Sequence, residues 1–97
     1  MLNGKVVVVT GGAGLIGKEF IKAIVENNGI AIIADINEDL SHRTKNQLSE
    51  ELQTDLIDFV KLDITSSISL DECIKYLDKK YRRIDALINN AYPTNKN

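Results

Sequence analysis

The sequence has few of the features that mark secreted, membrane-spanning or nucleic-acid-binding proteins. Cys73 is its single cysteine, so no internal disulfide framework can form and a reducing compartment is expected. No apolar run approaches the roughly 20 residues of a membrane-spanning helix, and glycines and Thr10 interrupt the apolar N-terminus where a signal peptide would continue. Twelve basic and fourteen acidic residues give a formal net charge of −2, which leaves no basic surface for nucleic acid or an anionic membrane. These absences predict a cytoplasmic protein with neither a membrane nor a nucleic acid as its partner.

What the sequence does contain is enough apolar character for one small folded domain. The chain has 97 residues, of which 43% are apolar, so a hydrophobic core is feasible and disorder is not expected. Pro93 is the single proline, and no repeat or low-complexity linker divides the chain. We therefore expect residues 1–97 to belong to a single structural unit.

Short apolar runs alternate along the chain with longer segments of helical periodicity. The first run, "KVVVVT", is continuous and β-branched, which is typical of a strand buried on both faces of a parallel sheet. The predicted strands are residues 5–10, 30–34, 57–63 and 84–89, and the predicted helices are residues 15–28, 38–53 and 69–82.

The spacing of apolar residues predicts which face each helix buries. In the first helix Ile16, Phe20 and Ile24 fall four residues apart, as they do on one helical face, and Ile21 and Val25 lie beside them. Before the third helix Ser69 and Glu72 have the S-x-x-E spacing of a capping box, which predicts that this helix begins at Ser69. The expected buried stripe of the third helix is Leu70, Ile74, Leu77 and Tyr81.

The order of elements, β-α-β-α-β-α-β, defines the fold class. Crossovers of this length make the strands parallel and the connections right-handed. The first three strands would lie side by side, and the fourth would return to the other side of the first, in the order 3-2-1-4. We therefore predict an α/β fold with a Rossmann-type, doubly wound parallel sheet that stops after its fourth strand. Ligands of such sheets bind in the crevice where the strand order reverses, between the ends of strands one and four.

The loop "TGGAGLIG" joins the first strand to the first helix. Gly12, Gly14 and Gly17 satisfy G-x-G-x-x-G, and Gly11, Gly14 and Gly17 satisfy G-x-x-G-x-x-G. Early glycines permit a sharp turn with positive φ, Gly14 leaves room for a pyrophosphate, and Gly17 lets the helix pack close to the strand. The free N–H groups at the helix start attract phosphate. A glycine-rich turn without a ligand is the alternative interpretation.

Asp35 follows the second strand, 18 positions after Gly17. A carboxylate there can accept hydrogen bonds from both hydroxyls of the adenosine ribose and would repel a 2′-phosphate, which favours NAD over NADP. The alternative is that Asp35 caps the next helix, a role that Asn37 could fill equally.

Four segments together resemble the short-chain dehydrogenase/reductase family: "TGGAGLIG", "ADI", "LDIT" and "INNA", in this order and at similar intervals. The resemblance extends over the whole chain and implies a partial NAD-binding domain over residues 1–97. It also implies that Asp63 bonds the adenine amino group, and that Asn89, Asn90 and Ala91 line the ribose and steady the central strands. From the residues alone, Asp63 could instead form a turn before Thr65. The cofactor-binding residues implied in this way are Gly11, Gly14, Leu15, Ile16, Gly17, Asp35, Ile36, Asp63, Ile64, Asn89, Asn90 and Ala91.

The chain departs from the family pattern at two places. Leu15 stands where the classical glycine loop has a glycine, so the spacing is closer to that of the extended, epimerase-like members. The family's "NNAG" reads "NNAY" here, with Tyr92 in place of glycine. The tail "AYPTNKN" resembles a subset of the family linked to modification of surface-polysaccharide or flagellin sugars.

The catalytic group of the family is expected to lie outside this chain. The family uses a serine and a Tyr-x-x-x-Lys pair that come after the fifth strand, where the lysine lowers the pKa of the tyrosine for proton transfer. Tyr76 and Lys80 have this spacing, but they precede the fourth strand, and we interpret them as part of a charged helix surface. His42 lacks a neighbouring ligand and is interpreted as solvated, and Cys73 as a small core residue.

The sequence supports three functional hypotheses. The first is the N-terminal, cofactor-binding part of an NAD-dependent oxidoreductase whose full-length form acts on a hydroxyl/carbonyl pair of a small molecule, with a sugar as one option, and is homo-oligomeric. The second is a stand-alone NAD-binding module without turnover, and the third is a remnant that binds nothing. The fourth strand, "IDALI", would be an apolar sheet edge, so we expect the isolated polypeptide to be marginally stable or to associate.

Overall fold

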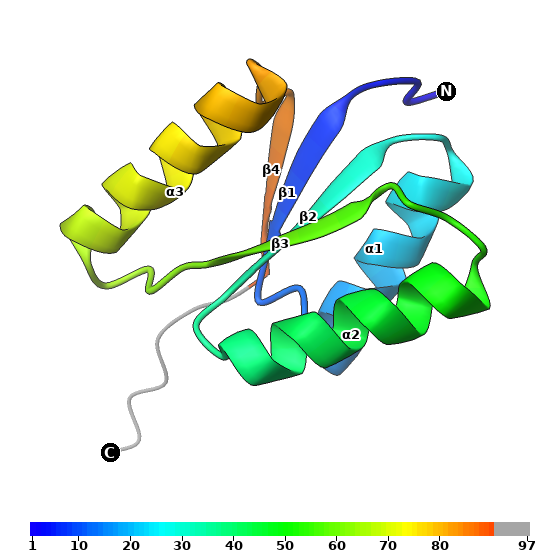
Figure 1. Ribbon diagram of the computed structural model, residues 1–97, viewed down its shortest axis with the longest axis horizontal. Coiled ribbons are helices and arrows are strands. Elements are labelled where there is room, and N and C mark those ends of the chain that lie inside the picture. The colour runs from blue at the N-terminus through cyan, green and yellow to red at the C-terminus, as the bar shows by residue number, and fades with distance from the viewer. Residues whose placement is uncertain (91–97) are drawn as a thin grey trace.

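A computed structural model describes residues 1–90 of the chain. They form four strands and three helices that alternate along the sequence (Figure 1). Ala91, Tyr92 and Pro93 lie outside the described residues. The elements are β1 (Val6–Thr10), α1 (Leu15–Glu26), β2 (Ile30–Asp35), α2 (Glu38–Glu51), β3 (Ile57–Lys61), α3 (Ser67–Tyr81) and β4 (Ala86–Asn89).

The strands form one parallel sheet in the order β3-β2-β1-β4, as predicted. The register aligns the carboxyl ends of β1 and its two neighbours, because Thr10 pairs with Ala34 on one side and with Asn89 on the other. Every residue of β1 is buried, as its β-branched composition predicts. The strand order therefore reverses at β1, and the residues after β1, β2 and β4 meet at one edge of the sheet.

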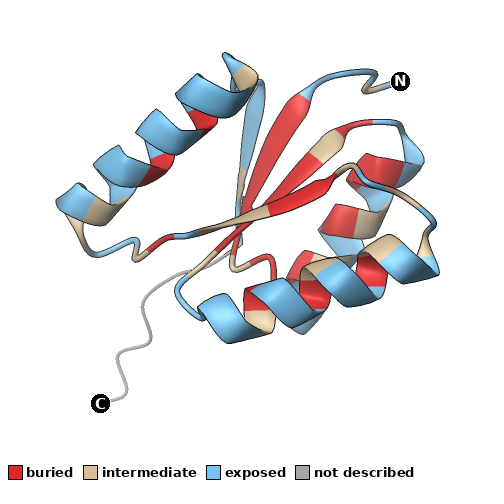
Figure 2. Cartoon of the chain, viewed as in Figure 1, coloured by how far each residue is buried: buried red, intermediate tan, exposed pale blue. Residues whose placement is uncertain are grey.

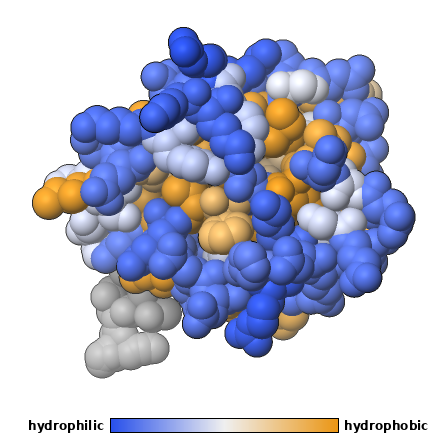
Figure 3. All heavy atoms as spheres, viewed as in Figure 1, coloured by the Kyte–Doolittle hydropathy of each residue, from blue (hydrophilic) through white to orange (hydrophobic). Residues whose placement is uncertain are grey.

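Two layers of helices cover the sheet, α1 and α2 on one face and α3 on the other (Figure 1). Alternate residues of β1 divide between the two layers: Val7 and Val9 pack with α1 and α2, whereas Val6 and Val8 pack with α3. Figure 2 shows the buried residues in red, concentrated along the central strands and on the sides of the helices that face them. In Figure 3, apolar side chains are visible between the polar side chains of α3 and α2.

The first helix buries part of the predicted apolar set. Ile21, Ile24 and Val25 are buried together with Gly17, whereas Ile16 and Phe20 are exposed. The reason is that Gly17 packs against the glycine loop, which turns the following residues at positions 21, 24 and 25 toward the sheet. Ile16 and Phe20 then lie beside this face.

The third helix begins at Ser67, two residues before the predicted start. Its N-cap is Ser66, whose side chain accepts a hydrogen bond from the Ser69 N–H at 3.1 Å. Ser69 does not cap the helix, because its Oγ accepts a bond from the Asp63 N–H at 2.9 Å. Cys73 and Leu77 are the buried residues of α3, whereas Leu70 and Ile74 of the predicted stripe are exposed.

Candidate dinucleotide site

The glycine loop makes a tight turn between β1 and α1. Gly11 has φ of 66°, a left-handed conformation that favours glycine. Its N–H donates to the Ala34 carbonyl at 2.7 Å, which ties the loop to the end of β2. The Gly14 N–H donates back to the Gly11 carbonyl at 3.1 Å, and Gly14 is the N-cap residue of α1. The loop therefore places Gly14 directly at the start of the helix.

Gly12 and Gly17 are required by packing. A Cβ on Gly17 would meet the Gly11 carbonyl oxygen and would lie 2.6 Å from the Gly12 Cα. A Cβ on Gly12 would lie 3.0 Å from the Val9 carbonyl oxygen and 3.2 Å from the Ile33 Cα. Both glycines thus allow a close approach of α1 to the strands, the role that the sequence predicts for Gly17.

Gly14 differs, because no packing contact demands a glycine there. It has φ of −80°, which any residue can adopt. Among residues 1–90, its added Cβ would meet one atom within 4 Å, the Gly11 carbonyl oxygen at an ordinary 3.5 Å. The space above Gly14 is therefore open, as a site for a ligand close to the backbone requires.

Among the helices of residues 1–90, α1 is the one whose start has no side-chain cap. Gly14 offers no capping side chain and no acidic residue lies in the first turn, whereas Asn37 caps α2 and Ser66 caps α3 through their side chains. First-turn N–H groups carry partial positive charge and need acceptors. Together with the open space at Gly14, these groups give the helix start the features that an anion-binding position needs.

Asp35 lies at the end of β2 and faces the glycine loop. One carboxylate oxygen accepts from the Ala13 N–H at 3.3 Å, and the other accepts from the Asn37 N–H at 3.1 Å. The cap of α2 is Asn37, whose side chain accepts from the Leu40 N–H at 2.9 Å. The helix-capping alternative for Asp35 is thereby removed, and its carboxylate lies beside the loop that follows β1.

The ends of β1 and β4 are joined through side chains. The Thr10 hydroxyl donates to the Asn89 side-chain oxygen at 3.0 Å and accepts from the Asn90 N–H at 2.9 Å. The Asn90 side chain donates to the Gly11 carbonyl at 3.2 Å. Asn89 and Asn90 therefore steady the central strands, as the resemblance implied, and Asn90 also holds the glycine loop. Ala91, predicted beside them, lies outside the described residues.

Asp63 forms the turn that the sequence left open as its alternative role. Its carboxylate accepts from both the hydroxyl and the N–H of Thr65, at 2.6 and 3.0 Å. These bonds, the one from the hydroxyl foremost, hold the pKa of Asp63 below its ordinary value, so the side chain is ionised at neutral pH. The turn does not exclude a contact to adenine, which stays a prediction.

Exposed apolar residues surround this edge of the sheet. They are Leu15 and Ile16 on α1, Ile36 after β2 and Ile64 after β3. All four are predicted cofactor-binding residues. Large apolar side chains exposed together at the end of a parallel sheet are typical of a ligand site rather than of a solvated surface.

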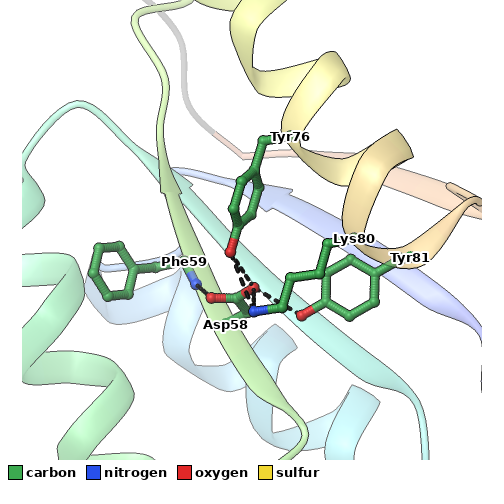
Figure 4. A network of polar contacts seen from close by, with 5 residues as sticks. All are labelled: Asp58, Phe59, Tyr76, Lys80 and Tyr81. Carbon is green, nitrogen blue, oxygen red and sulfur yellow. Dashed lines mark hydrogen bonds and ion pairs between the residues drawn. The ribbon is translucent and has the colours of Figure 1, made fainter.

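Tyr76 and Lys80 do not face this edge of the sheet. Both bond the buried carboxylate of Asp58 on β3, at 2.9 Å from the Tyr76 hydroxyl and 3.0 Å from the Lys80 amine, and Tyr81 donates to the same oxygen at 2.7 Å (Figure 4). Burial and the bond to Asp58 raise the pKa of Tyr76, the opposite of what a proton-transferring tyrosine needs. The structure thus places Tyr76 and Lys80 in a polar cluster on α3 and β3, and their exclusion from catalysis stays a prediction. Their partner Asp58 was missed. The signal available was a lone acidic residue, Asp58, in the strand "IDFVK".

The remaining residues singled out in the sequence have structural surroundings. Cys73 is buried, as predicted, and burial raises the pKa of its thiol. His42 is exposed, with its ring edge-on to Phe59 at 5.5 Å between centroids. Among residues 1–90, no three His, Cys, Asp or Glu side chains are grouped as metal ligands would be. None of the helices in this described part combines the length and apolar character of a membrane span.

The order β3-β2-β1-β4, the glycine loop at the switch point and the acidic end of β2 define a Rossmann-type dinucleotide-binding fold. The sequence profile of the short chain dehydrogenase family matches residues 5–96. The chain therefore belongs to the short-chain dehydrogenase/reductase family, and the predicted resemblance is confirmed.

Individual relatives agree with this assignment. The flagellin modification protein A of Campylobacter coli, named for post-translational modification, is 43% identical over 99% of this chain and 37% of its own length. The N-domain of a bacterial malonyl-CoA reductase, solved with NADP, has a TM-score of 0.91 and 28% identity over 95% of this chain and 17% of that one. A 3-ketoacyl-(acyl-carrier-protein) reductase from Brucella melitensis, solved with NADH, shares the fold with a TM-score of 0.79 and 22% identity, over 90% of this chain and 34% of that one. The chain spans about a third of the length of the curated relatives it matches.

Proposed function

We propose that this chain is the N-terminal, NAD-binding part of an oxidoreductase of the short-chain dehydrogenase/reductase family. The observation that carries the proposal is the uncapped start of α1 at Gly14, with an open space above it and the Asp35 carboxylate on the adjoining loop. A pyrophosphate is the anion that this family would place there, and a ribose is the group that a carboxylate beside it would bind.

The residues present fit the adenosine half of the cofactor. The first-turn N–H groups after Gly14 would bind the pyrophosphate, and Asp35 would accept from the ribose hydroxyls. Asp63 would accept from the adenine amine, between Ile36 and Ile64. Asn89, Asn90 and Ala91 would border the ribose, while Leu15 and Ile16 would cover the pyrophosphate.

The choice of NAD rests on the charge of Asp35. Its carboxylate has no cationic partner among the ion pairs of the described residues, so it would repel the phosphate of NADP. Nicotinamide dinucleotides transfer hydride to or from a carbonyl or hydroxyl carbon. We propose that the whole protein acts on such a pair in a small-molecule substrate and works in the cytoplasm as a homo-oligomer. The similarity to a flagellin modification protein supports a sugar as that substrate.

Isothermal titration with NAD and NADP tests the proposal. The Asp35→Ala change removes the two charge-assisted hydrogen bonds to the ribose hydroxyls. It should weaken NAD binding about tenfold or more and reduce the ratio of NAD affinity to NADP affinity. Asp55→Ala, an exposed carboxylate before β3, is the matched control and should bind as the unaltered chain does. Unchanged NAD affinity in Asp35→Ala, with no gain for NADP, would remove the ribose role.

A stand-alone NAD-binding module without turnover is the second candidate function. It is favoured by the bonding of Tyr76 and Lys80 to Asp58, which leaves the described residues without a Tyr-x-x-x-Lys pair directed at the site. The nucleotide sequence downstream of the Asn97 codon distinguishes the two candidates. A coding sequence that continues in frame into a serine and a Tyr-x-x-x-Lys pair supports the enzyme, and an immediate stop codon supports the module.

A further inference from the structure

We propose that α3 is a separately opening layer of this domain, held closed over the sheet by the cluster of hydrogen bonds that meets at Asp58. The inference starts from how little apolar surface secures this helix. Two of its fifteen residues, Cys73 and Leu77, are buried. Within residues 1–90, α3 lies alone on its face of the sheet, whereas α1 and α2 share the other face (Figure 1).

The apolar contacts of α3 are incomplete on the side toward β4. Leu70 and Ile74 are 48% and 47% exposed, although both line a groove whose far wall includes Leu87. The groove also reaches Ile64 beside the candidate dinucleotide site. Helices are held mainly by packing of an apolar face, so a helix with a half-empty face depends on its other attachments.

The Asp58 cluster is the polar attachment of α3 to the sheet. Asp58 lies in β3 opposite Ile32 and directs its side chain to the face that α3 covers. One carboxylate oxygen accepts from Tyr76, Lys80 and Tyr81, and the other accepts from the Phe59 N–H at 2.8 Å. Three residues of the last two turns of α3 therefore meet at one atom of the sheet.

This attachment depends on the charge of Asp58. Burial alone would raise its pKa, but the bonds from Tyr81, Lys80 and Tyr76 outweigh burial and hold the pKa below its ordinary value. Those three are the titratable groups that face Asp58 from α3, and Phe59 contributes its N–H from β3. Because the folded-state pKa is lowered, the stabilisation is complete above the ordinary value of 3.8 and is lost as the pH falls below it.

Cys73 is placed to report the opening. It is the single cysteine of the chain and lies on the buried face of α3, against Val8 and Leu77 in the same core cluster. A thiol reagent can reach it when α3 leaves the sheet. The labelling rate of Cys73 in excess iodoacetamide at pH 8 therefore measures the closed-to-open equilibrium of α3.

The experiment compares Asp58→Asn with the unaltered chain. An amide has one accepting oxygen where the carboxylate has two, so its NH₂ group must face either the α3 donors or the Phe59 N–H, and the negative charge opposite Lys80 is lost. We therefore expect labelling to accelerate about tenfold. Tyr76→Phe removes one donor from a side chain that is 38% exposed, and it should accelerate labelling by a smaller factor without threatening the fold. Asp71→Asn, which alters an exposed ion pair on α3 with Lys75, is the control and should leave the rate unchanged.

Amide hydrogen exchange separates opening of α3 from global unfolding. If α3 opens separately, Cys73 labelling should report a smaller opening free energy than exchange of the buried Val9 and Ile21 amides. The Asp58→Asn change should lower the opening free energy at Cys73 more than it lowers that of the Val9 and Ile21 amides. Equal opening free energies at all three positions would overturn the proposal, and so would an unchanged labelling rate in both Asp58→Asn and Tyr76→Phe.

Discussion

At the scale of single residues, the glycines of the loop after β1 have separable tasks. Gly12 and Gly17 let backbone pack on backbone, whereas Gly14 leaves an open space at the start of α1. This contrast supports a packing role for Gly12 and Gly17 and the proposed ligand-binding role for Gly14. The added-Cβ geometry distinguishes them without any ligand in place.

This difference predicts opposite outcomes for two alanine substitutions. Gly17→Ala forces a Cβ against the Gly12 backbone and should lower the free energy of unfolding by about 1–3 kcal/mol or more. Gly14→Ala fits the fold and should cost less than about 1 kcal/mol, yet it should weaken dinucleotide binding because the Cβ occupies the ligand's space. Urea denaturation and calorimetric titration of both variants measure the two effects. Equal loss of stability in the two variants would contradict the assignment.

The positions of single residues were predicted best where the backbone geometry or the end of a strand favours one type of residue. Gly17, Asp35 and Asn90 lie where the sequence placed them, because close packing and strand-end polarity leave few alternatives. Ser69 was misjudged as a cap since Ser66, three residues earlier, has the same capping chemistry and starts the helix instead. The lone acidic residue in the third strand marked Asp58 as unusual but did not identify its partners, because its donors come from α3, 18 to 23 positions further along the chain.

At the scale of elements, side-chain contacts at both ends of β4 add to its backbone pairing with β1. Asp85, immediately before it, accepts from the Val6 N–H at 2.7 Å and pairs with Arg83 at 2.7 Å. Thr10, Asn89 and Asn90 join its other end to β1. Between these points its side chains are mostly exposed, so side-chain packing adds little to the attachment of the strand.

The attachment of β4 through Asp85 should depend on pH. The bond from Arg83, followed by that from the Val6 N–H, lowers the pKa of Asp85 from 3.8 to about 2. A lowered folded-state pKa means that the stabilisation is present above about pH 4 and is lost as the pH falls toward 2. Asp85→Asn should therefore lower stability at pH 6 and flatten its decline between pH 4 and 2. Urea midpoints across this range test it, and a decline as steep as that of the unaltered chain would refute it.

At the scale of the whole molecule, one side of the sheet is left open. The outer edge of β4 pairs with no strand among the described residues, and Leu87 is 62% exposed on it. The facing groove below α3 adds further apolar surface. Uncharged, apolar sheet edges pair readily with other chains, so the isolated 97-residue polypeptide should associate.

Sedimentation velocity at micromolar concentrations tests this expectation. Leu87→Lys places a charge on the open edge and should shift the polypeptide toward monomer. Ile68→Lys replaces an apolar residue on α3 that is similarly exposed but lies outside the strand, and it should leave association unchanged. If the unaltered chain is monomeric and melts cooperatively, the open edge of β4 does not cause association.

The order of the strands in the sheet and of the helices along the chain was predicted correctly, because hydrophobic period and crossover length constrain topology strongly. The buried faces of α1 and α3 were predicted in part, since Ile24 and Leu77 are buried as expected. Apolar residues such as Ile16, Phe20, Leu70 and Ile74 fit the helical period but remain exposed, and period alone cannot show which apolar residues find a neighbour. Which apolar residues of a helix become buried depends on the strands and helices that pack against it.

The bare start of α1 also has a practical implication for solution work. Backbone donors at a helix terminus discriminate poorly among tetrahedral oxyanions, so inorganic phosphate or sulfate in a buffer would compete for the same position. The apparent dissociation constant of the dinucleotide should therefore rise with the concentration of phosphate or sulfate. The rise should exceed the one that sodium chloride causes at equal ionic strength.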